Sequence, residues 1–174
     1  MNIYLIGPMG SGKSTLGEKA AKVLGMEYCD MDRLVEAQAG MSISVQFERF
    51  GEAWFRDRES EAVRTVARRK NVLAATGGGV VLREANMEVL RKSGVILFID
   101  RPLAAILADI DLSGRPLAEG SEKLTEIYNR RLPLYRKYAG YTIKNDGAKA
   151  EGVQTLIQFI TEIKEKYDDT GTKA

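Results

Sequence analysis

Short apolar runs alternate along the chain with segments of helical periodicity. The apolar runs predict strands at 2–6, 27–30, 71–75, 94–99 and 140–144. The periodic segments predict helices at 13–24, 31–39, 43–50, 52–69, 83–92, 102–111, 122–138 and 149–166. The run Val95-Ile96-Leu97-Phe98-Ile99 is apolar at every position, which is typical of a strand covered on both faces. Because each connection has room for a crossover helix, the pattern predicts an α/β fold, three-layer αβα with a five-stranded parallel sheet.

The composition limits which side chains could act as a general base and which partners and compartment we expect. We expect residues 1–174 to form a single domain with a frayed tail at about 167–174, and a net charge of +2 is too small to favour nucleic acid as a partner. Without any histidine, a general base has to be a carboxylate, an amine or a phenol. The one cysteine, Cys29, is typical of a reducing compartment. No apolar run approaches the roughly 20 residues of a membrane span and no signal peptide precedes the first strand, so we expect a cytoplasmic protein, or the mature form of an imported one, that binds no membrane. Since nothing in the sequence indicates an obligate interface, we expect a monomer.

A glycine-rich loop follows the first predicted strand and leads into a helix. Its sequence, Gly7-Pro8-Met9-Gly10-Ser11-Gly12-Lys13-Ser14, fits G-x-x-x-x-G-K-[ST], the phosphate-binding P-loop. Glycines let backbone N–H groups turn toward an anion, and the helix N-terminus adds its dipole. The motif predicts that Lys13 reaches the β- and γ-phosphates of a nucleoside triphosphate and that Ser14 ligates Mg²⁺. The alternative is a glycine turn that binds nothing.

Ligands of such sheets bind beyond the carboxyl ends of the strands, where further polar residues lie. Asp30 and Asp32 follow the second strand. They could hold Mg²⁺ through water and accept a proton, but an aspartate there is equally a helix N-cap. Asp100 ends the fourth strand, as an acidic residue ends a strand in many P-loop proteins, yet Pro102 favours a capping role for it. Gly77-Gly78-Gly79 follow the third strand and indicate that a group approaches the backbone closely, with a flexible turn as the alternative.

Three arginines are candidates for binding an anion. Arg56 stands three residues before Glu59 in a predicted helix, a spacing that alone favours a solvated ion pair but also suits a guanidinium steadied to grip a carboxylate. Arg131 lies late on a helix, where a cation either complements the helix dipole or binds a ligand. Arg115 lies in a glycine- and proline-punctuated segment, about 110–122, that is either a mobile lid closing on the phosphates or a surface turn.

Taken in order, these motifs resemble the shikimate kinase family, within the nucleoside-monophosphate-kinase-like P-loop group. The matching elements are the P-loop, Asp30-x-Asp32, Gly51-Glu52-x-x-Phe55-Arg56-x-x-Glu59, Gly77-Gly78-Gly79, Arg115-Pro116-Leu117 and Arg131-x-Pro133-Leu134-Tyr135. Each of the later motifs is weak alone, but all of them in register are specific. The resemblance implies a P-loop kinase fold with a mobile lid. It also implies transfer of the γ-phosphoryl group of ATP to the 3-hydroxyl of shikimate, with Mg²⁺, in the pathway to aromatic amino acids.

The same resemblance implies the role of each site residue. It assigns catalysis to Lys13, Asp32 and Arg115; nucleotide binding to Gly10, Ser11, Gly12, Lys13, Ser14, Thr15 and Arg115; substrate binding to Asp32, Arg56, Gly77, Gly78, Gly79 and Arg131; and metal binding to Ser14 and Asp30. Asp32 would orient or deprotonate the attacking hydroxyl. Arg56 and Arg131 would clamp the substrate carboxylate, with Glu59 steadying Arg56.

One position departs from the family pattern. The resemblance leads us to expect a lid arginine packed on the adenine at position 108, where this chain has Ala108, followed by Asp109 and Asp111. The adenine contact is therefore in question. Three alternatives stay open: another small-molecule kinase of this fold, acting on gluconate or a nucleotide; a nucleotide-binding regulatory or interaction protein without catalysis; and an ATPase that does not use shikimate.

Overall fold

The computed structural model describes residues 1–109, 120–147 and 149–169. Within these residues the strands are β1 (Asn2–Ile6), β2 (Glu27–Asp30), β3 (Val72–Ala75), β4 (Gly94–Asp100) and β5 (Tyr141–Lys144). They form a 5-stranded sheet in the order β2-β3-β1-β4-β5, and every neighbouring pair is parallel. The predicted parallel sheet is therefore confirmed. Since β1 stands at the centre, with the chain running to one side of it and then to the other, the loop after β1 lies at the switch point where ligands of such sheets bind.

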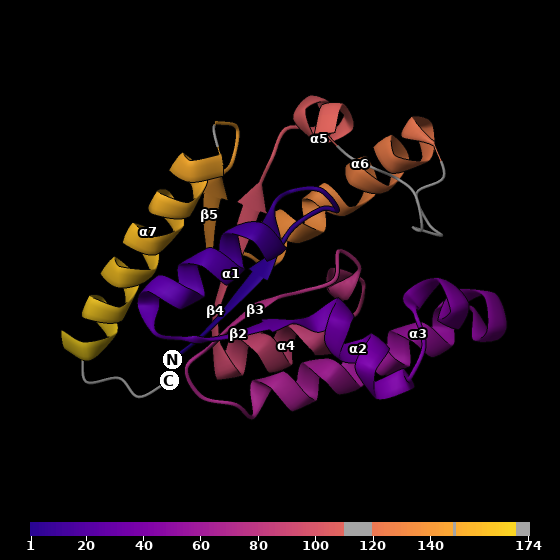
Figure 1. Cartoon of the computed structure of the whole chain (residues 1–174), viewed down its shortest axis with the longest axis horizontal. Coiled ribbons are helices and arrows are strands. Elements are labelled where there is room, and N and C mark those ends of the chain that lie inside the picture. The colour runs from indigo at the N-terminus through magenta and orange to yellow at the C-terminus, as the bar shows by residue number, and fades with distance from the viewer. Residues whose placement is uncertain (110–119, 148, 170–174) are drawn as a thin grey trace.

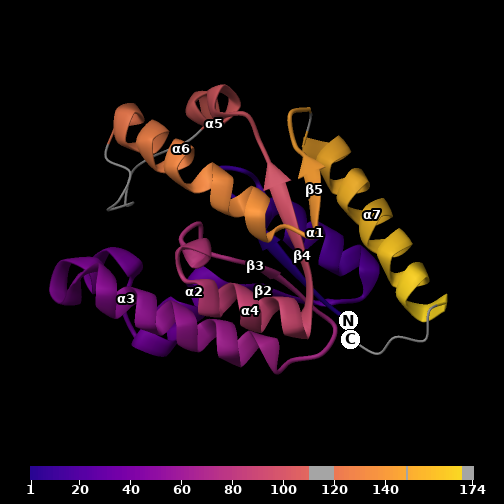
Figure 2. The ribbon, with the colours of Figure 1, turned by 180° about the vertical axis from the view of Figure 1, so that it is seen from behind.

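Helices cover both faces of the sheet (Figure 1; Figure 2). One face carries α1 (Lys13–Leu24) and α7 (Lys149–Asp169). The other carries α2 (Met31–Ala39), α3 (Ile43–Ala67), the 3₁₀ helix η1 (Val80–Leu82), α4 (Glu84–Ser93) and α6 (Ser121–Tyr138). Helix α5 (Leu103–Asp109) packs on α6 through a small cluster of Ile106, Leu124 and Tyr128. The arrangement is the predicted three-layer αβα fold.

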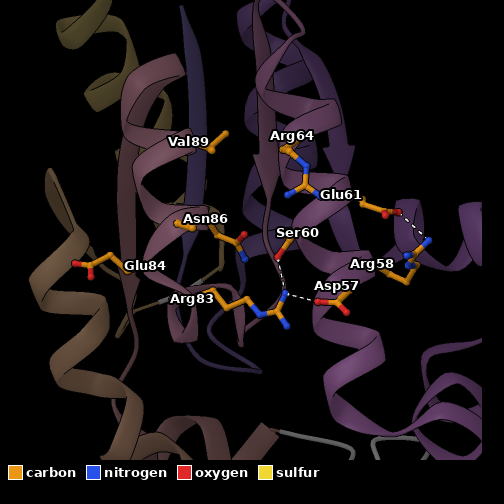
Figure 3. Close-up of a pocket in the computed structure, with 10 residues that line it drawn as sticks. Asp57, Arg58, Ser60, Glu61, Arg64, Arg83, Glu84, Asn86 and Val89 are labelled. Carbon is orange, nitrogen blue, oxygen red and sulfur yellow. Dashed lines mark hydrogen bonds and ion pairs between the residues drawn. The ribbon is translucent and has the colours of Figure 1, made fainter.

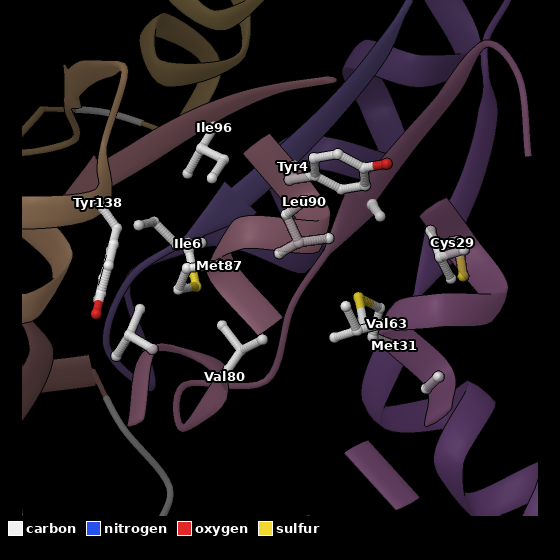
Figure 4. Packing of buried hydrophobic residues seen from close by; sticks show 14 of the residues in the cluster. Tyr4, Ile6, Cys29, Met31, Val63, Val80, Met87, Leu90, Ile96 and Tyr138 are labelled. Carbon is white, nitrogen blue, oxygen red and sulfur yellow. The ribbon is translucent and has the colours of Figure 1, made fainter. Parts of the chain in front are cut away.

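The central strand is buried along its whole length because both of its faces are covered. Ile3 and Leu5 belong to the core shared with α1 and α7. Tyr4 and Ile6 point the other way, into the core under α2, α3, α4 and α6 (Figure 4). A central strand of this kind contributes side chains to the cores on both faces of the sheet. Its sequence is therefore an unbroken apolar run rather than an alternating one.

Element boundaries differ from the prediction in a few places. The predicted helices 43–50 and 52–69 are joined in α3, but Gly51 at the junction has φ 80° and ψ 173°, outside the helical region, so the two halves meet at a kink. The 3₁₀ helix between the three glycines and α4 was not predicted, since three residues are too few to show a period. Helix α7 continues to Asp169, beyond its predicted end and into the segment expected to fray.

The segment after β4 corrects one expectation. The backbone N–H of Ile106 donates to Pro102 O at 3.1 Å, so α5 begins at Leu103 with Pro102 in the capping position. The capping role expected for Asp100 is therefore wrong, because the helix starts too far along the chain. Asp100 instead ends β4, and its carbonyl accepts the N–H of Asn145 at 2.8 Å.

Most of the expected lid, 110–122, falls outside the described residues, which omit 110–119 and with them Arg115. The described chain resumes at Gly120, and α6 begins at Ser121. In the part of the chain that the structure describes, no helix is both long and apolar enough to cross a membrane.

Candidate active site

The P-loop lies between β1 and α1. Three of its glycines have positive φ, at 151° for Gly7, 75° for Gly10 and 96° for Gly12. Space is also tight there, since a Cβ on Gly7 would lie 2.8 Å from Ile99 O and one on Gly12 would lie 2.7 Å from Asn145 Nδ2. Gly12 is the N-cap of α1, and no described side chain caps the first N–H groups of that helix. The loop therefore offers backbone donors and a helix N-terminus to an anion.

Lys13 holds its ammonium group inside the curve of the loop. The side chain is buried, and Nζ donates to Gly7 O at 2.9 Å and to Pro8 O at 2.8 Å. Ser11 Oγ lies 3.5 Å from the same nitrogen. Carbonyl oxygens offset the cost of burying the charge but do not neutralise it. The loop therefore holds a positive charge beside its backbone N–H groups, an arrangement that suits an anion.

Two side chains without a role in the sequence analysis hold the outer side of the loop. Arg101 Nη1 donates to Gly10 O at 3.0 Å, and Asn145 Nδ2 donates to Ser11 O at 2.8 Å. Arg101 also pairs with Asp109 at the end of α5. Because these carbonyls are satisfied from outside, the loop is held in shape before a phosphate arrives. Both residues directly follow a strand, β4 or β5, and that position is the signal by which they could be found from the sequence.

Asp30 serves two partners at once. One carboxylate oxygen, Oδ1, accepts the backbone N–H groups of Asp32 at 3.1 Å and Arg33 at 3.3 Å, which makes Asp30 the N-cap of α2. The other, Oδ2, accepts the hydroxyl of Ser14 at 2.8 Å. The capping interpretation is therefore confirmed. It does not exclude the other interpretation, because capping fixes the carboxylate against Ser14, and paired oxygen ligands of this kind suit Mg²⁺.

The glycines after β3 are needed because side chains crowd their backbone. A Cβ on Gly77 would lie 2.6 Å from Asp32 Oδ1 and 2.9 Å from Glu59 Oε1, and one on Gly79 would overlap the guanidinium of Arg56. The close approach predicted from these glycines is confirmed, and the approaching groups include the protein's own side chains. Two carboxylates and a guanidinium thus converge on one short segment of backbone.

Gly78 joins this segment to the P-loop and to α6. A Cβ on Gly78 would lie 3.5 Å from the backbone nitrogen of Met9, an ordinary contact, so Gly78 is less crowded than Gly77 and Gly79. The hydroxyl of Tyr135 donates to Gly78 O at 2.6 Å, and its ring stacks on Phe98 with centroids 5.5 Å apart. Burial raises the pKa of Tyr135 to about 12, so the phenol keeps its proton and continues to donate.

Arg56 is buried rather than solvated. Its Nη1 contacts Glu59 Oε2 at 2.9 Å and its Nη2 contacts Glu52 Oε1 at 3.0 Å. The side chains of Arg56 and Glu59 are only 8% and 4% exposed, so the solvated ion pair favoured by their spacing is wrong. Spacing shows which residues share a helix face, but here that face turns toward the glycine segment instead of water.

Arg131 is a second buried cation in the same region. It is 6% exposed, and its Nε has no hydrogen-bond partner among the described residues. Burial lowers the pKa of Arg131, and the nearby positive charge of Arg56 lowers it too, while Tyr135 opposes the change. The helix continues well past Arg131, with Arg136 and Lys137 in its last turn, so the dipole interpretation is wrong.

Glu59 completes the cluster. Burial raises its pKa to about 7; Arg56 opposes that rise and Asp32 adds to it. Its Oε1 has no donor partner within the described residues. Two guanidinium groups therefore lie near two carboxylates, and within the described residues Arg131 Nε and Glu59 Oε1 are buried atoms of this cluster without a hydrogen-bond partner. A ligand that carries both a carboxylate and hydroxyl groups would match these remaining groups.

The comparisons with known proteins agree with this arrangement. The model of the shikimate kinase family matches residues 9–161. A shikimate kinase from Clostridium botulinum is 42% identical over 159 residues, which cover 91% of this chain and 96% of that protein. A solved structure of shikimate kinase from Acinetobacter baumannii in complex with shikimate superposes with a TM-score of 0.87 at 36% identity, over 94% of each chain.

A gluconokinase from Sinorhizobium meliloti, by contrast, superposes with a TM-score of 0.63 at 13% identity, over 98% of this chain and 97% of its own. At that identity only the fold is shared. The family match spans most of the chain, from the P-loop to α7, and contains both the phosphate loop and the cluster of buried charges. This chain belongs to the shikimate kinase family.

Proposed function

We propose that this protein transfers the γ-phosphoryl group of ATP to the 3-hydroxyl of shikimate, giving shikimate 3-phosphate and ADP in aromatic amino acid biosynthesis. The observation that carries the proposal is the pair of buried cations, Arg56 and Arg131, of which Arg131 has an unpartnered Nε among the described residues. Arg56 already pairs with Glu59 and Glu52, whereas Arg131 makes no ion pair with the described residues, and a buried charge of this kind is costly unless an anion joins it. Shikimate supplies a carboxylate for this pair, and hydroxyl groups for Asp32 beside it.

In this proposal each side chain of the site has a separate role. Lys13 and the loop N–H groups bind and neutralise the phosphates. Arg56 and Arg131 hold the substrate carboxylate and so fix the ring, with Gly77, Gly78 and Gly79 lining it. Asp32 accepts a hydrogen bond from the attacking hydroxyl and takes its proton as the new O–P bond forms. Because phosphoryl transfer runs through a loose transition state, positioning and charge neutralisation supply most of the acceleration. Arg115 keeps its proposed role at the transferred phosphate on the family resemblance alone.

Mg²⁺ fits the oxygen ligands beside the P-loop. Ser14 Oγ and Asp30 Oδ2 lie 2.8 Å apart, and oxygen ligands with retained waters are what this ion prefers. We propose that Ser14 holds the ion directly and that Asp30 holds it through water. When bound, the ion would neutralise charge on the phosphate oxygens.

The decisive experiment is ADP formation from MgATP by the purified protein, with shikimate, gluconate and nucleoside monophosphates offered separately. We expect shikimate to stimulate ADP formation about 100-fold or more over background hydrolysis, because substrate binding completes the site. Stimulation by gluconate instead would mean that the arginine pair binds another acid. If ATP binds but none of the acceptors stimulates turnover, the chain is a regulatory nucleotide-binding protein and the proposal fails.

Position 108 tests how the nucleotide base is held. Ala108 is exposed on α5, where arginine is tolerated by a helix. Ala108→Arg is expected to lower the KM for ATP by about three- to tenfold, the range that a cation–π contact with adenine would give. The matched control Ala108→Gln adds a long side chain without charge and should leave that KM unchanged. If the arginine variant gains no more than the glutamine variant, this protein holds adenine by other contacts.

We further propose that residues 1–174 act as one domain and as a monomer in the cytoplasm, without nucleic acid or membrane partners. The two cores share one sheet, which supports a single folding unit. The single cysteine, Cys29, is buried, and a small net charge of +2 supports a small-molecule rather than a nucleic-acid partner.

A further inference from the structure

A pocket of about 640 Å³ opens between α3 and α4, on the surface behind the buried cluster (Figure 3). Its polar lining comes from both helices and from Arg83, the residue that links η1 to α4. None of its lining residues belongs to the P-loop or to the proposed substrate site. The pocket is therefore a candidate for a separate ligand.

The negative charges of the pocket are already paired. Arg83 contacts Asp57 at 2.7 Å, and Arg58 contacts Glu61 at 2.9 Å. Glu84 pairs with Lys137, outside the pocket, and Figure 3 shows its carboxylate turned away from the other groups. These pairs remove the carboxylates as partners for further cations in the pocket.

The remaining groups are donors. Arg64 lines the pocket, is exposed, and has no ion pair or hydrogen bond with the described residues. Arg83 makes its hydrogen bonds through Nη1, to Arg56 O, Asp57 Oδ1 and Ser60 Oγ, so its Nε and Nη2 remain available. Asn86 is 3% exposed and its Nδ2 has no partner among the described residues. Figure 3 shows the Asn86 amide turned toward Ser60 and Arg83.

We propose that this pocket binds a small oxyanion, a phosphate or carboxylate group, between Arg64 of α3 and Arg83 at the start of α4. The free edge of the Arg83 guanidinium has the planar fork that matches such a group, and Arg64 supplies the uncompensated positive charge. The Asn86 amide, which lines the same pocket and has no partner for its Nδ2 among the described residues, is a further donor.

The same arginine connects the pocket to the proposed substrate site. Arg83 Nη1 donates to Arg56 O at 3.0 Å and to Ser60 Oγ at 3.1 Å, so it ties α3 to the segment that begins with the three glycines. An oxyanion that bridges Arg64 and Arg83 would tighten this tie and hold Arg56 in place. It would therefore lower the KM for shikimate. By linkage, bound shikimate would raise the affinity for the oxyanion by the same factor by which the oxyanion raises the affinity for shikimate. This second effect rests on the proposed function, whereas oxyanion binding does not.

Binding is tested by calorimetric titration of the full chain with inorganic phosphate, at constant ionic strength and with ADP saturating so that the P-loop is filled. Succinate replaces phosphate in a second arm, with the proposed substrate site filled by shikimate, to distinguish phosphate from carboxylate chemistry. Trp54, the single tryptophan, gives a parallel fluorescence signal because its ring lies 5.3 Å from the guanidinium carbon of Arg58, which lines the pocket. We expect one saturable site per chain for at least one of the two anions.

The variants decide where that site lies. Arg64→Gln should weaken oxyanion binding about tenfold, because it removes the uncompensated charge while breaking no contact within the described protein. Arg91→Gln changes an exposed arginine of α4 outside the pocket and should bind as the wild type does. Equal affinity in Arg64→Gln and wild type, or no saturable binding by either method, overturns the proposal. If oxyanion binds with this variant pattern but shikimate KM is unchanged by it, the site stands and the coupling is wrong.

Discussion

Replacing Asp32 with Asn is expected to lower turnover by about 100- to 10,000-fold, the range that a positioned general base contributes. Asp32 lies in the first turn of α2, and its Oδ1 occupies the space that a Cβ on Gly77 would need, in the cluster that would hold the substrate. Asparagine keeps the size and hydrogen-bonding shape of the side chain but cannot take the proton of the attacking hydroxyl. Affinity for MgATP should change little, because the Ser14–Asp30 contact and Lys13 remain.

Steady-state kinetics and an independent MgATP titration separate these two quantities. The control is Glu88→Gln, the same loss of charge on an exposed residue of α4, which should leave turnover unchanged. A folded Asp32→Asn protein that retains more than about one third of wild-type turnover would remove Asp32 from any proton-transfer role. The change would then have cost less than a kilocalorie per mole of transition-state stabilisation.

The sequence predicts best what depends on neighbours in the chain. The strands and the helix boundaries follow from apolar runs and periodicity, and the P-loop follows from glycines whose positive φ only glycine adopts readily. The break at Gly51 was predictable for the same reason, since glycine both weakens a helix and permits the observed φ of 80°. Local rules therefore account for the frame on which the site is built.

Contacts between distant segments could not be predicted in this way. Asn145 reaches Ser11, Arg101 reaches Gly10 and Tyr135 reaches Gly78, each joining a separate strand or helix to a loop. Their position after a strand marks Arg101 and Asn145 as candidates, but only the folded sheet decides which loop carbonyl each of them meets.

Burial was the harder property to predict. Arg56 and Glu59 have the spacing of an ordinary surface ion pair, and nothing within their own helix shows that the glycine segment will cover them. For Asp30 the two interpretations were not exclusive, because one carboxylate oxygen caps a helix while the other contacts Ser14. The roles of these residues with a substrate stay predictions.

Arg131→Met is expected to raise the KM for shikimate about 100-fold or more while the KM for ATP stays within about twofold. Removing one partner of a buried charge pair costs about 2–5 kcal/mol of binding, and the substrate carboxylate would lose such a partner. The cost to the fold should be small, because Arg131 makes no ion pair with the described residues and its Nε has no hydrogen-bond partner among them. Its removal relieves the burial cost of the charge and the repulsion with Arg56 but loses the interactions with Tyr135 and Glu59, so the free energy of unfolding should change little.

Arg56→Met provides the contrast, since it should raise the same KM but also destabilise the protein. It leaves Glu59 buried without its ion-pair partner, and Arg56 is what opposes the rise in the pKa of Glu59, already about 7. A carboxyl with a pKa raised above its unfolded value binds its proton more tightly in the folded state. Its stability contribution is thus greatest at low pH and is lost as pH rises through the folded pKa. The destabilisation of Arg56→Met relative to wild type should therefore be larger at pH 8 than at pH 6.

Chemical denaturation at both pH values, together with the two Michaelis constants, distinguishes a substrate clamp from a structural pair. A clamp requires both variants to lose shikimate affinity, although only Arg56→Met loses stability. If Arg131→Met unfolds more readily than wild type, Arg131 stabilises the protein itself in the absence of a ligand, and the argument from its unpartnered Nε fails. If Arg131→Met is stable and binds shikimate normally, the substrate carboxylate is bound elsewhere. The variant gives this answer because it removes the positive charge that we assign to carboxylate binding.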